Sequence, residues 1–386
     1  MKLLIYTHEF PPFLGGLATT SYKLARGIAG SGIDLTVLAP SYSAEDSNAD
    51  NGLDCRVIRM PGLRSRAAGF IPFAQILLGR YYLGRALRSE RPDAVLFITE
   101  EAEAAGGLLG NFNFKPIVRV AGSGITTCFY SRRPVKRLMS YPMSRLYYRA
   151  ATVIAVSNST KHLLESIGVA PEKISVVYNG VEDEMLSRGV DTDRVAGLRA
   201  RYGLSADTPV LITIARVLPR KGQDTVIKAL PGVIEKFPDI MYLVVGEGRY
   251  TDSFSKLARE CGVGDKVIFT GGVTHEDTAS YLDLSDIFVM PNRFWNNKIE
   301  GLPNALLEAS ARAKPVIAGK HGGSVEAVLH GESGLLVDGE SVDEVKEALL
   351  ELLSDRSKAL RMGARGREAI IKRHTERHMI DNYVRV

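Results

Sequence analysis

The chain has 386 residues, of which 45% are hydrophobic and 24% are charged, as in ordinary soluble globular proteins. This length suits two domains, and no run approaches the roughly 18 apolar residues of a membrane-spanning helix. The first apolar run, residues 3–6, is too short for the core of a signal peptide, so we expect none. Three scattered cysteines without metal-ligand spacing predict reduced thiols and a cytoplasmic location.

The net charge of +5 is unevenly distributed. Residues 1–186 contain 21 Lys/Arg and 16 Asp/Glu, whereas the remainder contains 28 of each. Stretches 55–89 and 104–164 contain no acidic residue, and tyrosines interleave with basic residues between Phe129 and Arg149. This pattern is typical of contact with an anionic membrane or a lipid phosphate, and it also fits a solvated face. We expect no nucleic acid partner, and peripheral contact with the inner face of the cytoplasmic membrane stays open.

Short β-type runs alternate with helical patterns along both halves of the chain. The expected strands are Leu3–Thr7, Leu35–Ala39, Val95–Ile98, Ile117–Ala121, Val153–Val156 and Ser175–Tyr178, then Val210–Ala215, Tyr242–Val245, Val267–Thr270, Ile287–Met290, Val316–Ala318 and Leu335–Val337. Strands separated by helices predict parallel pairing in two doubly wound, Rossmann-like α/β domains. Turn signals place the domain boundary within residues 179–209.

Two carboxylates, Glu300 and Glu308, lie eight positions apart in the second half. A buried strand at residues 286–290 precedes them, and a helix should follow with Pro303 in its first turn, where a missing N–H is no loss. A carboxylate is a good acceptor for sugar hydroxyls. One carboxylate could therefore bind a hexose and the other a ribose. In the alternative interpretation, Glu300 caps its own helix and Glu308 is a solvated helical residue.

The start of that helix also predicts an anion site. The backbone N–H groups of Gly301, Leu302 and Asn304 would lie at the positive end of the helix dipole, which favours a phosphate. A phosphate site flanked by two carboxylates suits a nucleotide sugar.

Ligands of open α/β sheets bind at the carboxyl ends of the strands. Arg216 and Lys221 follow the first strand of the second half and offer a forked donor and a point charge to a diphosphate, unless they are solvated strand-end cations. Glycines that open loops after other strands are Gly15, Gly16, Gly246 and Gly272. Each of these could let a phosphate approach the backbone or form a simple tight turn.

In this order the motifs resemble the retaining glycosyltransferases of family 4. The matching segments are Phe10–Pro12 with Gly15 and Gly16, Ala155–Ser159, Tyr178–Val181, Arg216 with Lys221, Val245–Gly248, and Glu300 with Glu308. The loop before the glutamates and the run Pro315–Gly319 are most similar to the phosphatidylinositol mannosyltransferase and lipid-linked-sugar branch. The resemblance implies a GT-B architecture, in which two Rossmann-like domains face each other across a cleft.

The resemblance also implies domain roles. Residues 1–185 would form the acceptor-side domain, with a last helix near 371–386 returning to it, and residues 186–370 would bind the nucleotide sugar. Arg216, Lys221 and Glu300 would carry catalysis, with Glu300 on the hexose, and Glu308 would bind the ribose. The remaining donor-binding positions would be Gly15, Gly16, Gly246, Gly272, Val273, Gly301, Leu302 and Pro303. No metal or other cofactor is implied.

One position departs from the family pattern. Many members carry a histidine after the strand near 117–120, where this chain has Ala121 and Gly122. Backbone N–H groups or Ser123 could take over its role, or the acceptor could bind differently.

The expected reaction is transfer of a hexose from a UDP- or GDP-sugar to a sugar or lipid-linked acceptor, in the synthesis of cell-envelope glycolipid or polysaccharide. Alternatives are a sugar-nucleotide epimerase, a phosphorylase, or a catalytically silent subunit that binds a nucleotide sugar.

Overall fold

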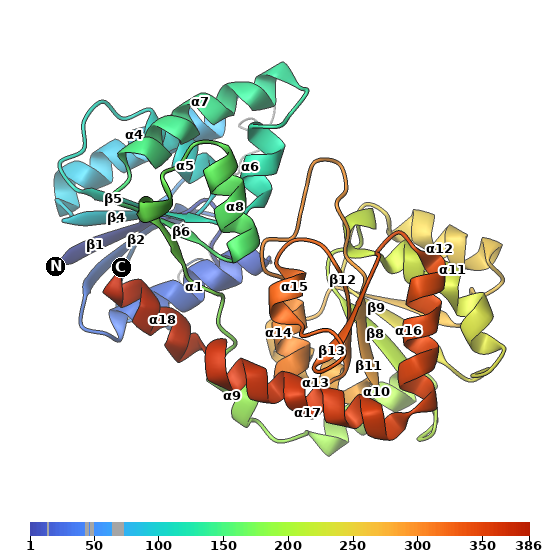
Figure 1. The fold of residues 1–386 in the computed structure, drawn as a ribbon. Helices are drawn as coiled ribbons and strands as arrows, with labels where there is room; N and C mark the ends of the chain where they lie inside the picture. The colour runs from blue at the N-terminus through green and yellow to red at the C-terminus, as the bar shows by residue number, and fades with distance from the viewer. Residues whose placement is uncertain (14, 43–45, 47–49, 64–72) are drawn as a thin grey trace. The chain divides into compact units, whose positions relative to one another are not determined.

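The computed structural model describes residues 1–13, 15–42, 46, 50–63 and 73–386. The chain forms two compact units, each a parallel sheet covered by helices (Figure 1). The N-terminal unit comprises residues 1–179 and 376–386, and the C-terminal unit comprises residues 180–375. The boundaries expected from the sequence, after residues 185 and 370, lie close to these. Within the described ranges no helix is both long and apolar enough to cross a membrane.

The strands of each sheet are all parallel. The N-terminal sheet has the order β3-β2-β1-β4-β5-β6-β7, and the C-terminal sheet has the order β10-β9-β8-β11-β12-β13. The strands are β1 (Lys2–Tyr6), β2 (Asp34–Pro40), β3 (Arg56–Met60), β4 (Ala94–Phe97), β5 (Lys115–Val120), β6 (Thr152–Ala155) and β7 (Ile174–Val176), then β8 (Val210–Ile214), β9 (Met241–Val245), β10 (Val267–Gly271), β11 (Ile287–Met290), β12 (Val316–Gly319) and β13 (Gly334–Val337). The predicted Rossmann-like fold class is confirmed.

Every strand expected from the sequence is present, and β3 is an additional one. It pairs with β2 at the edge of the N-terminal sheet, where its three central residues are only partly buried. Arg56 and Arg59 interrupt its apolar pattern, which is why the sequence did not predict it. Arg59 is not left unpaired, because its guanidinium bonds the Asp50 carboxylate at 2.6 Å and the Pro40 carbonyl oxygen at 2.8 Å.

Helices cover both faces of each sheet. Those of the N-terminal unit are α1 (Gly16–Ala29), α4 (Ala74–Glu90), α5 (Glu100–Gly107), α6 (Ser123–Cys128), α7 (Pro134–Arg149), α8 (Asn158–Ser166) and α18 (Glu376–Arg385). Those of the C-terminal unit are α9 (Asp183–Ser187), α10 (Thr192–Arg201), α11 (Gln223–Ile234), α12 (Thr251–Glu260), α13 (His275–Leu284), α14 (Asn304–Ala311), α15 (Ser324–Ala327), α16 (Val342–Ser354) and α17 (Arg356–Arg373). Short 3₁₀ turns occupy Pro171–Lys173 and Pro219–Lys221.

Helix α18 packs on the N-terminal unit although it ends the chain. Ile380 is buried in one core with residues of α1 and the sheet, and Gly27 of α1 lies directly beneath it. A Cβ on Gly27 would lie 2.4 Å from Cγ1 of Ile380, so only glycine allows this close approach. Arg26 adds an ion pair to Glu376, in which its Nη2 atom donates to both carboxylate oxygens at 2.9 Å.

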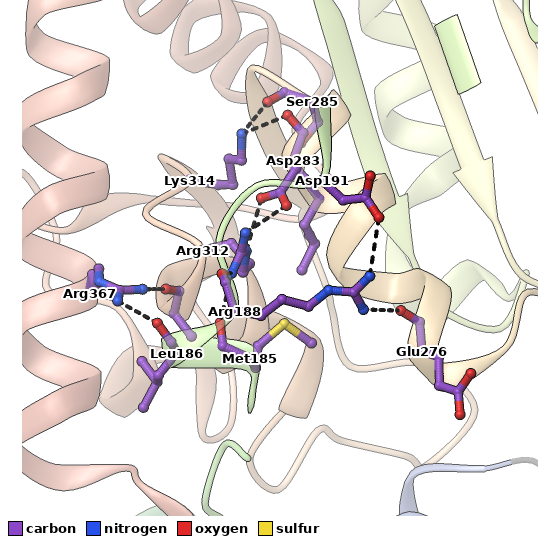
Figure 2. Close-up of polar contacts among 12 residues, drawn as sticks. Met185, Leu186, Arg188, Asp191, Glu276, Asp283, Ser285, Arg312, Lys314 and Arg367 are labelled. Carbon is purple, nitrogen blue, oxygen red and sulfur yellow. Dashed lines mark hydrogen bonds and ion pairs between the residues drawn. The ribbon is translucent and has the colours of Figure 1, made fainter. Parts of the chain in front are cut away.

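Helix α9 and the residue after it follow the unit boundary and are held in the C-terminal unit by arginine side chains, one of which belongs to a buried ion pair (Figure 2). Arg312 and Asp283 pair at 2.6 Å, and the side chain of each is only 5% exposed. The same guanidinium donates to the carbonyl oxygens of Met185, at 3.1 Å, and Arg188. Arg367 of α17 donates to the carbonyl oxygen of Leu186 at 2.6 Å. These contacts hold α9 against α14 and α17.

Candidate active site

The strand order of the C-terminal sheet reverses between β8 and β11, and open α/β sheets bind ligands outside the carboxyl ends of strands at such a point. The loops that leave these two strands touch each other. Gly222, with φ of 81°, lies so close to Pro291 that a Cβ would be 2.2 Å from its carbonyl oxygen. Residues 215–222 and 291–303 therefore form one site.

At this edge two cations contact one carboxylate. The Nη1 atom of Arg220 lies 3.2 Å from Oε1 of Glu300, and Nζ of Lys221 lies 3.0 Å from the same oxygen. The three side chains are 9–13% exposed. The short turn Pro219–Lys221 allows both cations to reach this point, and Arg220 also donates to the carbonyl oxygen of Ile299 at 3.1 Å.

The ion pairs shift the pKa values of the buried groups. Burial opposes ionisation of Glu300, but Lys221 and Arg220 outweigh it and hold the pKa of Glu300 below its ordinary value. Burial lowers the pKa of Lys221, and the attraction of Glu300 only partly offsets that effect. Lys221 is therefore an interior cation, and the alternative of a solvated strand-end cation is wrong for it.

Arg216 differs from its two neighbours. Its side chain is exposed, and among the described residues it has neither a hydrogen bond nor an ion pair. Its charge nevertheless acts on the pKa values of both Lys221 and Glu300, so it lies near the pair. Arg216, Arg220 and Lys221 carry three positive charges against one carboxylate. The cluster thus has a positive excess that suits an anion, with Arg216 as its accessible group.

Asn292, which the sequence did not suggest, joins two loops of the site. Its side-chain oxygen accepts hydrogen bonds from the Gly319 backbone N–H at 3.2 Å and from the Ser324 hydroxyl at 2.9 Å. A Cβ on Gly319 would lie 1.7 Å from the carbonyl oxygen of Asn292. This asparagine fixes the start of α15 beside the end of β11.

Two further glycines bring the same loop against the residues around Glu300. A Cβ on Gly322 would lie 2.2 Å from the Glu300 carbonyl oxygen, and one on Gly323 would lie 1.7 Å from that of Gly301. The Gly323 N–H donates to the Glu300 carbonyl oxygen at 3.0 Å. The backbone around Glu300 is thereby fixed from both sides.

The other predicted donor-site residues of this unit lie in nearby loops. Gly301, Leu302 and Pro303 are buried immediately before α14, with Pro303 at the N-cap rather than in the first turn. Glu308 is half-buried on α14, and the described part of the chain offers its side chain no ion pair or hydrogen bond.

Of the two predicted donor-site glycines in the β9 and β10 loops, Gly246 has a position that only glycine can take, whereas Gly272 has room for a Cβ. Gly246, with φ of 133°, lies against β8, where a Cβ would be 2.2 Å from the Ala215 carbonyl oxygen. Gly272 is exposed after β10, and its N–H donates to the Glu247 carboxylate at 3.4 Å. Val273, which follows it, is half-buried.

Gly15 and Gly16 belong to the N-terminal unit, where they begin α1. A Cβ on Gly16 would meet no atom within 4 Å, so its backbone is open to an approaching group. Gly122 lies in the loop where many family members carry a histidine. It has φ of 91° and precedes α6.

Comparison with known proteins shows the family. The family models described as Glycosyltransferase Family 4 and Glycosyl transferases group 1 match residues 14–185 and 197–369. The chain is 42% identical over 378 residues to the GDP-mannose-dependent alpha-(1-6)-phosphatidylinositol monomannoside mannosyltransferase of Mycolicibacterium smegmatis, covering 95% of this chain and 92% of that protein. It is 34% identical over 386 residues to the protein of the same name from Mycobacterium tuberculosis, covering 95% and 93%.

The fold agrees with this relationship. The crystal structure of Anabaena HepE in complex with UDP and glucose matches with a TM-score of 0.81 and 18% identity, covering 100% of this chain and 98% of that one. The architecture is therefore that of the GT-B glycosyltransferases. The resemblance drawn from the motifs is confirmed: this chain belongs to family 4 of the glycosyltransferases and is a nucleotide-sugar-dependent transferase.

Proposed function

We propose that this enzyme transfers mannose from GDP-mannose to a hydroxyl of a phosphatidylinositol mannoside, or of a closely similar glycolipid, with retention at the anomeric carbon. The positively charged cluster around Glu300 carries the proposal, because it offers a diphosphate its charge complement at the ligand edge of the sheet. The choice of base, sugar and acceptor follows the names of relatives that are 34% and 42% identical.

In the proposed reaction, the acceptor oxygen attacks the anomeric carbon from the face that the diphosphate leaves. The bond to the acceptor forms as the bond from the anomeric carbon to the diphosphate oxygen breaks, and the acceptor's proton passes to the leaving diphosphate. Arg216 and Lys221 would stabilise the charge that develops on that leaving group. Glu300 would contact the hexose and Glu308 the ribose. The proposal includes no metal ion.

A thermal-shift panel of GDP-mannose, GDP, UDP-glucose and ADP-glucose tests the donor. A ligand at 100 times its dissociation constant stabilises the native state by about 2.7 kcal/mol, and we expect this for the guanosine compounds. Glu308→Ala should reduce the shift caused by GDP, because the ribose loses its carboxylate acceptor. A flat panel with the wild-type protein would overturn the donor assignment, and an unchanged GDP shift in Glu308→Ala would overturn the ribose contact.

Product analysis separates the proposal from its alternatives. A transferase makes a mannosylated lipid only when the acceptor is present. An epimerase would instead release a changed sugar nucleotide without an acceptor, and a silent subunit would give neither product.

The proposal also includes peripheral membrane contact through a basic aromatic face of the N-terminal unit. On residues 132–149 this face exposes Tyr141, whose residue is 72% exposed, and Leu138, at 62%. Its other exposed members are Arg132, Arg133, Val135, Arg137, Arg145, Tyr148 and Arg149, with Leu77, Arg80, Tyr81 and Arg85 on α4. Basic and apolar groups together on one exposed face suit the headgroup region of an anionic bilayer.

Helices α4 and α7 both pack on α5, and Figure 1 shows them on the same side of the N-terminal sheet. Arg80 of α4 donates to the Leu108 carbonyl oxygen at 3.3 Å, while Arg149 of α7 donates to that of Gly110 at 2.8 Å. Such contact would place the enzyme at the cytoplasmic surface of the membrane that holds its acceptor.

A further inference from the structure

The backbone of Arg216 lies just beyond the end of β8, where both of its neighbours still bond to the adjacent strand β9. The Ala215 N–H donates to the Val245 carbonyl oxygen at 2.9 Å. The Val217 N–H donates to the carbonyl oxygen of Glu247 at 3.0 Å. Because alternate residues of a strand bond to opposite neighbours, the carbonyl group of Arg216 points away from β9 and towards β11, the strand on the other side of β8.

The chain turns away at the point where β11 would bond to this carbonyl group. Residues of β8 and β11 that lie opposite each other are 76 positions apart in the sequence. In this register the Asp286 N–H donates to the Val210 carbonyl oxygen at 2.9 Å. The same register would bring the N–H of Asn292 to the carbonyl oxygen of Arg216. That N–H donates instead to the Met290 carbonyl oxygen at 2.7 Å.

Gln223, the first residue of α11, supplies a donor in place of β11. Its side-chain nitrogen, Nε2, donates to the Arg216 carbonyl oxygen at 3.1 Å. Turning the amide over would bring Oε1 against that carbonyl oxygen, so Nε2 must be the atom that faces Arg216. The residue is 0% exposed, and its side chain therefore does not itself meet a ligand.

The other end of the amide indicates that stability alone does not explain this glutamine. Its Oε1 atom is buried and has no hydrogen-bond partner among the residues that the structure describes. Burying an unpaired amide oxygen costs free energy, and an apolar side chain of the same length would avoid that cost. Such local rules are often broken at functional or strained sites. What the glutamine provides is its bond to Arg216.

Arg216 depends on its backbone for its position, because its side chain is not fixed by a partner. The guanidinium is exposed and makes no ion pair or hydrogen bond within the described ranges, whereas Arg220 and Lys221 are held by Glu300. The direction in which the guanidinium projects is thus set where the side chain begins. A small displacement of a group that acts on the reacting atoms can lower a rate by about 10²-fold.

We propose that Gln223 is a positioning residue for the transfer reaction. It holds the backbone of Arg216 at the end of β8, so that the guanidinium projects at the edge of the sheet where the leaving diphosphate would lie. The inference rests on the proposed function, which assigns Arg216 to that leaving group. Gln223 touches neither substrate in this role and acts through Arg216.

Gln223→Met keeps the length of the side chain and removes the donor, so it tests this role directly. We expect kcat to fall by about tenfold or more while the KM for GDP-mannose changes little, because charge on the leaving group develops in the transition state. The Tm should stay close to that of the wild type, since the variant loses one hydrogen bond and also one unpaired buried oxygen.

Tyr242→Phe is the matched control within the same sheet. Tyr242 is also 0% exposed, and its hydroxyl forms a hydrogen bond with that of Thr213 at 2.7 Å. The control therefore loses a buried side-chain hydrogen bond that does not involve Arg216. Its kcat and its KM for GDP-mannose should both stay at the wild-type values.

A double-variant cycle separates positioning from a general structural defect. If Gln223 acts through Arg216, Gln223→Met should cause no further loss of kcat in an Arg216→Ala background. A further loss by the same factor as in the wild type would overturn the proposal, because Gln223 would then act independently of Arg216. Gln223→Leu, which also lacks the donor, is measured in the same way should Gln223→Met fold poorly.

Wild-type kcat in both Gln223 variants would overturn the proposal as well. If the wild type transfers mannose and Arg216→Ala is slow, that result leaves the proposed function intact and only the role of Gln223 is wrong. Wild-type kcat in Arg216→Ala would remove both residues from the reaction. The thermal shift that GDP causes in the wild type does not depend on any Gln223 variant, so it distinguishes these outcomes from failure of the donor assignment.

Discussion

Glu300, Arg220 and Lys221 depend on one another because all three are largely buried. Loss of the sole partner of a buried charge typically costs about 3–5 kcal/mol, and loss of one of the two cations leaves Glu300 with a single partner and costs part of that. We therefore expect Arg220→Met to lower the free energy of unfolding by a few kcal/mol, as measured by urea denaturation. Lys221→Ala should destabilise the protein for the same reason, so its activity alone would not report on catalysis.

Arg216→Ala is the matched comparison, because Arg216 is exposed and has no ion-pair partner in the described structure. Its stability should be unchanged within about 0.5 kcal/mol, while turnover falls on the order of 10² because charge on the leaving group loses a donor. If Arg216→Ala and Arg220→Met lowered the free energy of unfolding equally, Arg216 would not be the accessible cation and Arg220 the buried one.

Glu103 should make stability depend on pH. Burial raises its pKa from the ordinary 4.5 to about 8, so between these values the folded state holds a proton that the unfolded state has lost. Stability from this group is full below about pH 4.5 and falls as the pH rises through 8. Glu103→Gln has no such group to titrate, so its stability should lack this loss. The Tm of the variant minus the Tm of the wild type should therefore increase between pH 5 and pH 9. A constant Tm difference over this range would show that Glu103 does not titrate there.

At the scale of elements, the sequence predicted most of the framework. Strands buried on both faces appear as continuous apolar runs between helices, which is why the central strands of both sheets could be placed. The edge strand β3 was missed because Arg56 and Arg59 bond to groups that no local pattern reveals. Arg56 pairs with Glu90, which lies 34 residues away.

The site was only partly predictable for the same reason. Loop positions after strands indicated Arg216, Lys221 and Glu300, but which neighbouring side chain turns inward depends on the 3₁₀ turn at Pro219–Lys221. That turn directs both Arg220 and Lys221 to Glu300. Asn292 acts on residues 27 and 32 positions away, a tertiary contact that leaves no local signature.

The ion pair of Arg312 and Asp283 should hold α9 to its unit. Because both side chains are 5% exposed, Arg312→Met leaves a buried carboxylate and should cost about 3–5 kcal/mol in urea denaturation. The double variant Arg312→Met/Asp283→Leu should regain much of that loss, since neither member of the pair is then left as an unpaired buried charge. Arg365→Met breaks an exposed pair with Glu368 and should change stability by at most about 1 kcal/mol. Similar losses for Arg312→Met and Arg365→Met would refute the role of burial.

At the scale of the whole molecule, charge is unevenly divided between the two units. The positive excess of the chain lies in residues 1–186, where the described arginines and tyrosines gather on α4 and α7. In the C-terminal unit, Arg220 and Lys221 are paired with Glu300, whereas Arg216 is accessible at the same edge of the sheet. This division suits an enzyme whose donor is a soluble nucleotide sugar and whose acceptor belongs to a membrane.

Membrane contact through the basic aromatic face is testable with liposomes. Each Lys or Arg near an anionic surface contributes about 1 kcal/mol, and salt screens the attraction. We expect co-sedimentation that increases with anionic lipid, falls with added salt, and weakens when Arg132, Arg133, Lys136 and Arg137 are changed to serine.

The matched control changes four exposed basic residues of the C-terminal unit, Lys256, Arg259, Arg361 and Arg365, to serine. It removes the same charge from a different unit, so its liposome binding should stay close to that of the wild type. Leu138→Ser with Tyr141→Ser keeps every charge and removes apolar contact, so its binding should weaken at all salt concentrations, because burial of apolar surface is not screened. Equal loss in the two charge variants would mean that net charge drives binding without a defined face. Absence of binding by the wild type to any liposome would leave this face solvated, and the acceptor would then have to reach the enzyme from solution.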